Sequence, residues 1–281
     1  MAGNDIHGTC CAGVAMAAGA LAKVFGAAPK AQLLPVKVFH ADALATESRV
    51  ADAIRYASRF ADILSCSWKG PESPDIEAAL EEAGGGRGGK GCPVFVATGN
   101  DHAGVVAYPA HSPHAIAVGA STNKEKRAAY SNFGPEVSIV ASSSGGTAGI
   151  FTTDVGYPDR GFNLGSAAAG GADGLHANDF GGTSSATPLA AGVAALVLSV
   201  NPNLPRGDVR KILQETADKI GPANAYKPNG HSDEYGYGRI NADKAVARAL
   251  QLAAAGTSGR TPVRATGRAR ARKGRKTRRA A

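Results

Sequence analysis

The stretch Pro-Val-Phe-Val-Ala-Thr at residues 93–98 (PVFVAT) is apolar at nearly every position. A strand with one face in water alternates between apolar and polar residues, so a continuous apolar run indicates a strand that is buried on both faces. Similar short runs predict four more such strands, at residues 33–39, 63–67, 115–120 and 137–141. Strands of this kind are typical of a parallel sheet that is covered by helices on both sides.

Helical patterns separate these apolar runs. Residues 47–60 place Val50, Ile54 and Ala57 on one face, and Ser73 followed by Pro74 is a typical helix start. The apolar run at 186–200 predicts a buried core helix. We also expect helices at residues 12–22, 206–219 and 241–252, and irregular structure at residues 142–181. The fold class is therefore α/β, with a mostly parallel sheet between layers of helices.

Composition separates the chain into two parts. Of 281 residues, 43% are hydrophobic, which is enough for a core, but residues 260–279 contain ten Arg or Lys and no acidic residue. The net charge of +8 thus arises from this end of the chain. We expect a folded domain at residues 1–255 and a basic, disordered tail at 256–281. The tail could contact polyanions, namely nucleic acid, an anionic membrane or an acidic protein, or it could be a solvated extension.

The cysteines and the apolar runs give little further information on the class of protein. The four cysteines have no metal-ligand spacing and predict buried free thiols. We find neither a membrane-spanning run nor a signal peptide in the sequence as given.

Three short segments carry side chains suited to catalysis. His7 stands in His-Gly-Thr before a small-residue run, Asn100 follows the 93–98 strand, and Ser184 opens the core helix. In parallel sheets, ligands gather at the carboxyl ends of strands, and a helix start favours developing negative charge. Each residue also has a simpler interpretation, because serine often caps a helix and asparagine is common in turns.

The three segments together, in this order, resemble the subtilase family of serine peptidases. HGTCCAG (7–13) resembles the family's histidine motif, VFVATGND (94–101) its oxyanion segment and GGTSSATP (181–188) its nucleophile motif. The resemblance implies a three-layer subtilisin-like fold and an endopeptidase that cleaves peptide bonds through an acyl-enzyme. Both the subtilisin-like and the kexin-like branches remain open.

The resemblance also implies roles for individual residues. Ser184 would be the nucleophile, His7 its general base and then acid, and Asn100 a donor in the oxyanion hole. The segment Ser67, Trp68, Lys69 and Gly70 would bind the extended substrate as an added strand. Trp68 would form a pocket wall there, or it could be a partly buried core aromatic.

The family's triad aspartate has no equivalent in the sequence as given. Only six residues precede His7, and Asp5 lies too close to His7 to serve. We therefore expect that the chain is truncated at its amino end and that the first strand of the sheet is missing. A non-catalytic peptide-binding protein or an inactive fragment is the alternative.

The resemblance implies a protein or peptide substrate, a monomer and a complete form that is secreted. It requires no cofactor for the chemistry. Structural calcium would be compatible with the family, but no ligands are assigned.

Overall fold

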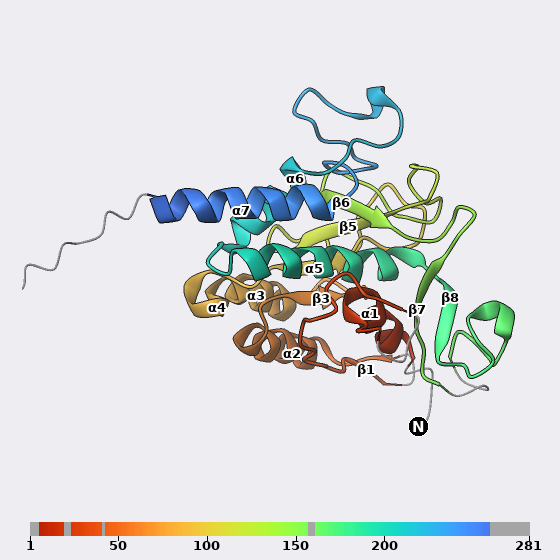
Figure 1. Ribbon diagram of the computed structural model, residues 1–281. Helices are drawn as coiled ribbons and strands as arrows, with labels where there is room; N and C mark the ends of the chain where they lie inside the picture. Colours follow the sequence, from red (N-terminus) through yellow and green to blue (C-terminus); the bar gives the residue numbers. More distant parts are fainter. Residues whose placement is uncertain (1–5, 20–23, 41–42, 157–160, 259–281) are drawn as a thin grey trace, which may run out of the picture.

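The parallel sheet forms as the apolar runs predict. The computed structural model describes residues 6–19, 24–40, 43–156 and 161–258. Within them, four strands pair in parallel in the order β3-β4-β5-β6 (Figure 1). These are β3 (Leu64–Cys66), β4 (Val94–Ala97), β5 (Ile116–Ser121) and β6 (Val137–Ser142). All four positions confirm the predicted strands, and β4, from the PVFVAT stretch, lies inside the sheet.

Helices cover both faces of this sheet. Along β4, Val94 and Val96 pack into a core with α2 (Glu47–Phe60) and α3 (Pro74–Glu82). The intervening Phe95 packs on the opposite side, in a second core that includes residues of α5, α6 and α7. Their bounds are α5 (Gly182–Val200), α6 (Arg206–Glu215) and α7 (Ala242–Ser258). Alternate side chains of one strand thus supply two cores, which gives the three-layer architecture.

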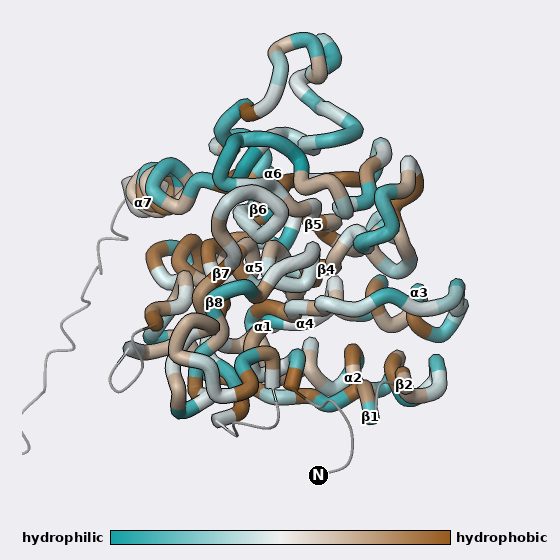
Figure 2. Tube along the Cα trace, turned by 90° about the vertical axis from the view of Figure 1, so that its right-hand side faces the viewer, coloured by the Kyte–Doolittle hydropathy of each residue, from teal (hydrophilic) through white to brown (hydrophobic). Residues whose placement is uncertain are grey.

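The helix boundaries mostly follow local signals. At α3 the Ser73 side chain accepts the backbone N–H of Ile76, and Pro74 occupies the first turn. Figure 2 shows hydrophobic and hydrophilic stretches alternating along α2 and α3, as expected for helices with one buried side. The remaining short segments are η1 (Ala83–Gly85), α4 (Gly86–Gly89), η2 (Ala167–Ala169) and η3 (Ala223–Ala225).

The first helix differs from its prediction. It is α1 (His7–Met16), so it begins at the candidate histidine and ends six residues before the predicted end at residue 22. Residues 20–22 lie outside the described residues. The small-residue run has no amphipathic pattern to mark a boundary, because α1 lies between other elements and contacts both α5 and β7.

The strand predicted at residues 33–39 is wrong except at its end. Only β1 (Phe39–His40) is a strand, and it pairs antiparallel with β2 (Ala43–Leu44). Leu33 is 57% exposed, and residues 33–38 belong to no sheet within the described part of the chain. A strand is defined by its hydrogen-bonded neighbour, so an apolar run alone is not sufficient.

The segment at 142–181 is more regular than predicted. It contains β7 (Ile150–Thr153) and β8 (His176–Phe180), which pair antiparallel. The sequence of β8, His-Ala-Asn-Asp-Phe, has no strand pattern, although His176, Ala177 and Phe180 are buried. The sequence did not predict this strand because its side chains are buried by residues that are distant in the sequence, and not by an alternating apolar pattern along the strand.

Helix α5 is the centre of the second core. It packs on the sheet and on α1, and Gly192 lies so close to α1 that an added Cβ would stand 2.9 Å from the Ala15 carbonyl oxygen. In the described part of the chain it is the one helix long and apolar enough to cross a membrane, but 67% of its apolar window is buried in the protein. The prediction of a core helix agrees with this packing.

Candidate active site

Ser184 lies in the first turn of α5, at the positive end of the helix dipole. The helix starts after Gly181, and no side chain caps it, so Ser184 is not a helix cap. Gly182 has a φ of +73°, a conformation that favours glycine. A side chain on Gly181 would collide with the Ser144 hydroxyl. The two glycines therefore allow a tight turn that presents Ser184, whose side chain is partly exposed.

Asn100 reaches this turn from the end of β4. Its Oδ1 accepts hydrogen bonds from the Thr183 backbone N–H (2.8 Å) and the Thr183 hydroxyl (2.9 Å). Among the described residues, the amide Nδ2 has no hydrogen-bond partner. Because the oxygen is engaged, the two N–H donors of Asn100 are available for a ligand next to Ser184.

His7 is the first residue of α1. Its Nδ1 lies 3.6 Å from the Cys11 Sγ one turn later, and the Cys11 thiol donates to the Ser184 carbonyl oxygen at 3.5 Å. The edge of the His7 ring packs on Phe180, with ring centroids 5.6 Å apart. Cys11 thus links the first turns of α1 and α5, which places His7 beside the turn that carries Ser184.

Burial favours the neutral forms of the His7 imidazole and the Cys11 thiol. It lowers the pKa of His7, which favours the neutral imidazole that a general base requires. Burial raises the pKa of Cys11 to about 12, so the thiol is neutral. Within the described residues, no carboxylate forms an ion pair with His7. The nitrogen that would face a triad carboxylate faces Cys11 instead.

The segment predicted to bind substrate follows the carboxyl end of β3. The Ser67 hydroxyl donates to the Ser184 carbonyl oxygen at 2.9 Å, and the Gly70 N–H donates to the Tyr108 carbonyl. Trp68 is partly buried and packs against the core beneath α2 and α3. Ser67 therefore lies at the site, while Trp68 has the contacts of a core aromatic.

Lys69, in the same segment, is exposed and pairs with Asp101, the residue after Asn100, at 2.6 Å. Hydrogen bonding from Lys69 lowers the pKa of Asp101. The ion pair joins the loops that follow β3 and β4.

Sequence reasoning missed several site neighbours. Cys11 was classed as a buried thiol, although it contacts both the His7 ring and the Ser184 backbone carbonyl. The hydroxyls of Tyr130, Ser143 and Ser185 form a cluster below the α5 turn. No local pattern could have found them, because residues far apart in the sequence meet only in the fold.

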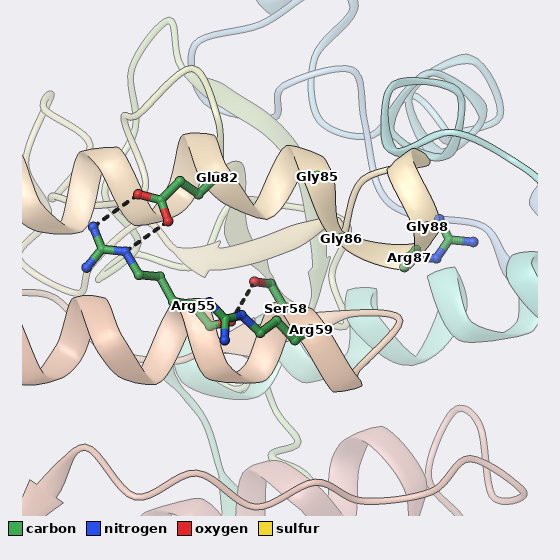
Figure 3. A pocket seen from close by; sticks show the side chains of 8 residues that line it. All are labelled: Arg55, Ser58, Arg59, Glu82, Gly85, Gly86, Arg87 and Gly88. Carbon is green, nitrogen blue, oxygen red and sulfur yellow. Dashed lines mark hydrogen bonds and ion pairs between the residues drawn. The ribbon is translucent and has the colours of Figure 1, made fainter.

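Two hollows lie elsewhere. One, of about 490 Å³, is lined by α2, η1 and α4 residues including Arg55 and Arg59 (Figure 3). Arg55 there is held by Glu82 at 2.9 Å. The other, of about 410 Å³, lies between α1 and the exposed segment at Leu33 and Pro35. Neither hollow is lined by Ser184 or Asn100.

The remaining histidines form no metal site. In the part of the chain that the structure describes, no group of three or more His, Cys, Asp or Glu side chains is placed to hold a metal ion. Carboxylate clusters are the usual calcium donors, so the described residues do not assign a calcium site. These histidines are His40, His102, His111, His114, His176 and His231.

Comparison with known proteins identifies the family of this chain. Residues 2–238 match the model of the subtilase family, so the chain belongs to that family. A "Calcium-dependent protease" from Trichormus variabilis is 40% identical over 279 residues, covering 88% of this chain and 40% of the relative. Subtilisin Savinase from Lederbergia lenta is 33% identical over 85% of this chain and 77% of its own length. This chain therefore spans less than half the length of the first relative.

The fold is also that of solved serine proteases. A serine protease of Aeromonas sobria superposes with a TM-score of 0.78, covering 94% of this chain and 55% of the other, at 21% sequence identity. The three-layer fold with its parallel sheet is thus subtilisin-like.

Proposed function

We propose that this chain is the peptidase domain of a serine endopeptidase and that Ser184 is its nucleophile. One observation supports the proposal: the turn that carries Ser184 is contacted by Asn100 from the β4 loop and by Cys11, which lies one turn after His7 in α1. Thr183 joins Asn100 to this turn, and Cys11 joins His7 to it. Family membership supports the same chemistry.

The chemistry assigns one task to each group. Neutral His7 removes the proton from the Ser184 hydroxyl as this oxygen attacks the peptide carbonyl, and it then returns the proton to the leaving amine. The Asn100 amide and the Ser184 backbone N–H donate to the oxyanion that develops. Ser67 contacts this turn, and an extended substrate would pair with the backbone of residues 67–69, since the Gly70 N–H already donates to the Tyr108 carbonyl.

The third member of a serine peptidase triad is a carboxylate that orients the histidine. Among the described residues, the side chain that lies next to His7 Nδ1 is the Cys11 thiol and not a carboxylate. Asp5 lies outside the described residues. We propose that residues 1–281 lack the triad aspartate, which would lower turnover about ten-thousandfold relative to a complete site.

A second function rests on this same observation. Without a carboxylate to orient His7, the segment at residues 67–70 could bind peptides beside Ser184 without cleavage. The two functions differ in the reactivity of Ser184, because an unactivated serine does not react with fluorophosphonates.

Further features of the protein are proposals by analogy with its relatives. We propose that the complete protein is secreted, acts as a monomer on protein substrates and binds structural calcium outside the chemical site. The last of these follows from a relative described as a calcium-dependent protease. The basic tail would contact polyanions.

The test is labelling by a fluorophosphonate probe. Residues 1–281 and a version extended by an aspartate-bearing amino-terminal strand are compared with Ser184→Ala in each background. Ser199→Ala is the matched control, since Ser199 lies on the exposed end of the same helix. We expect strong labelling and casein hydrolysis in the extended version, trace labelling in residues 1–281 and none after Ser184→Ala. Undiminished labelling after Ser184→Ala would refute the nucleophile, and tight peptide binding without labelling in either background would favour the second function.

A further inference from the structure

A cluster of hydroxyl groups lies directly below the turn that carries Ser184. The Tyr130 hydroxyl is 2.8 Å from the Ser143 hydroxyl, which is 2.7 Å from the Ser185 hydroxyl. Ser143 is 3% exposed, and Ser185 is fully buried. Buried hydroxyls in such a chain orient one another, because each has one proton to donate.

The cluster ends on a backbone carbonyl of the turn. Ser143 donates to the Gly182 carbonyl oxygen at 2.8 Å, and it then accepts from the hydroxyls on either side. The Tyr130 hydroxyl is also 3.0 Å from the Ser144 carbonyl oxygen, so its single proton is shared between this carbonyl and the Ser143 hydroxyl. The Tyr130 backbone carbonyl accepts the N–H of His102, two residues after Asn100.

The peptide group between Gly182 and Thr183 is consequently held at both ends. Its carbonyl accepts from Ser143 at 2.8 Å and from Ser185 at 3.2 Å, and its N–H donates to Asn100 Oδ1 at 2.8 Å. Gly182 has a positive φ and thus few steric restraints of its own. External hydrogen bonds therefore set the orientation of this peptide, which lies one residue before Ser184.

We propose that Tyr130, Ser143 and Ser185 are positioning residues that clamp the Gly182–Thr183 peptide and so aim the hydroxyl and backbone N–H of Ser184. This inference rests on the proposed function of Ser184. It assigns the hydroxyl cluster a role in the rate of the chemical step, beyond its contribution to stability.

The experiment compares Ser143→Ala and Tyr130→Phe, each of which removes one hydroxyl and leaves most of the packing. Fluorophosphonate labelling separates the limiting rate, kinact, from probe affinity, KI. Loss of one hydrogen bond that orients the reacting group should reduce kinact about tenfold in Ser143→Ala, with KI unchanged. Tyr130→Phe should have a smaller effect, and the double variant should be no slower than Ser143→Ala, because Tyr130 acts through Ser143.

Hydrogen exchange of the Thr183 amide provides a readout that does not need activity. Ser143→Ala should accelerate this exchange about tenfold, because the Gly182 carbonyl then keeps only the longer hydrogen bond from Ser185. Labelling is therefore measured in the amino-terminally extended version. If that version is not labelled with Ser184 intact, the proposed function fails, and the exchange rate alone decides whether the clamp exists.

Ser138→Ala is the matched control. Its hydroxyl is also buried and accepts from the Gln214 side chain at 2.9 Å, but it lies on β6 and not in the cluster. It should lower the melting temperature as Ser143→Ala does and leave both kinact and Thr183 exchange unchanged. Equal kinact in Ser143→Ala and Ser138→Ala, or unaltered exchange at Thr183 in Ser143→Ala, would overturn the proposal.

Discussion

The first turns of α5 and α1 meet at the candidate site, but they are held in different ways. Around Ser184, Asn100, Ser143 and Ser67 each form a hydrogen bond with the turn, and they come from three other loops. Around His7 the neighbours are a neutral thiol and the ring of Phe180, which lies nearly perpendicular to the imidazole. The serine turn is thus fixed by polar contacts, whereas the histidine depends on where its helix packs.

The position of α1 is set by β7. The Thr152 hydroxyl donates to the Cys10 carbonyl at 2.7 Å, and the Thr153 hydroxyl donates to the Thr9 carbonyl at 3.0 Å. Gly13 lies against the same two threonines without space for a Cβ. Polar substitutions should therefore impair the α5 turn, and changes of volume should impair the α1 side.

The largest effect is expected at Asn100. Asn100→Ala removes a donor to the oxyanion and should lower turnover by roughly a hundredfold to a thousandfold, the loss known for one such donor in subtilisin. Asn100→Asp keeps an oxygen for Thr183 and removes the amide, so it separates donation from the support of the turn. The measurement is kcat and KM on a peptide substrate. A change confined to KM would show that Asn100 only positions the substrate.

The next effect tests the α1 side. Gly13→Ala should force α1 away from β7, because the new methyl would come within 2.8 Å of the Thr153 backbone nitrogen. Overpacking of this kind costs about 1–3 kcal/mol, and labelling of Ser184 should fall as His7 moves. Thermal unfolding and labelling are measured together.

Gly8→Ala is the control for that substitution. Gly8 lies on the same helix, and nothing lies within 4 Å of an added Cβ. It should stabilise the helix slightly, by up to about 1 kcal/mol. Equal behaviour of the two variants would show that the packing of α1 on β7 does not position His7.

Features that depend on local sequence could be predicted, whereas features that depend on contacts between distant residues could not. Strands such as β4 and β5 were predictable because burial on both faces leaves continuous apolar runs. Residues 33–39 were predicted incorrectly, because a strand forms only where a neighbouring strand pairs with it through backbone hydrogen bonds. His7, Asn100 and Ser184 stand in motifs that could be identified locally. Tyr130, Ser143 and Ser185 could not, since only tertiary packing brings them to the same turn.

The pH dependence tests the surroundings of His7. Burial lowers the pKa of His7 below the ordinary histidine value of about 6.5, so the imidazole remains neutral to lower pH. The acid limb of the labelling rate should therefore have its midpoint below 6.5. Stability that depends on this group should be lost as the pH falls below the same value, because the unfolded state binds the proton more readily. A midpoint above 7 would reveal a carboxylate beside His7 and would contradict the thiol contact.

The smallest effect is expected from the basic end of the chain. Helix α7 continues to Ser258, three residues into the tail expected from composition, and its Ala245 and Ala249 are buried in the core. All ten basic residues of the tail follow Ser258. Removal of residues 259–281 should therefore change neither the melting temperature nor the labelling of Ser184, because both halves of the site are held by contacts within residues 6–258. Binding to a short DNA duplex should be lost with the tail, and in the full chain it should weaken steeply as salt rises, since neutralised phosphates release counterions. DNA binding that survives removal of the tail, or that does not change with salt, would exclude the tail as the polyanion contact.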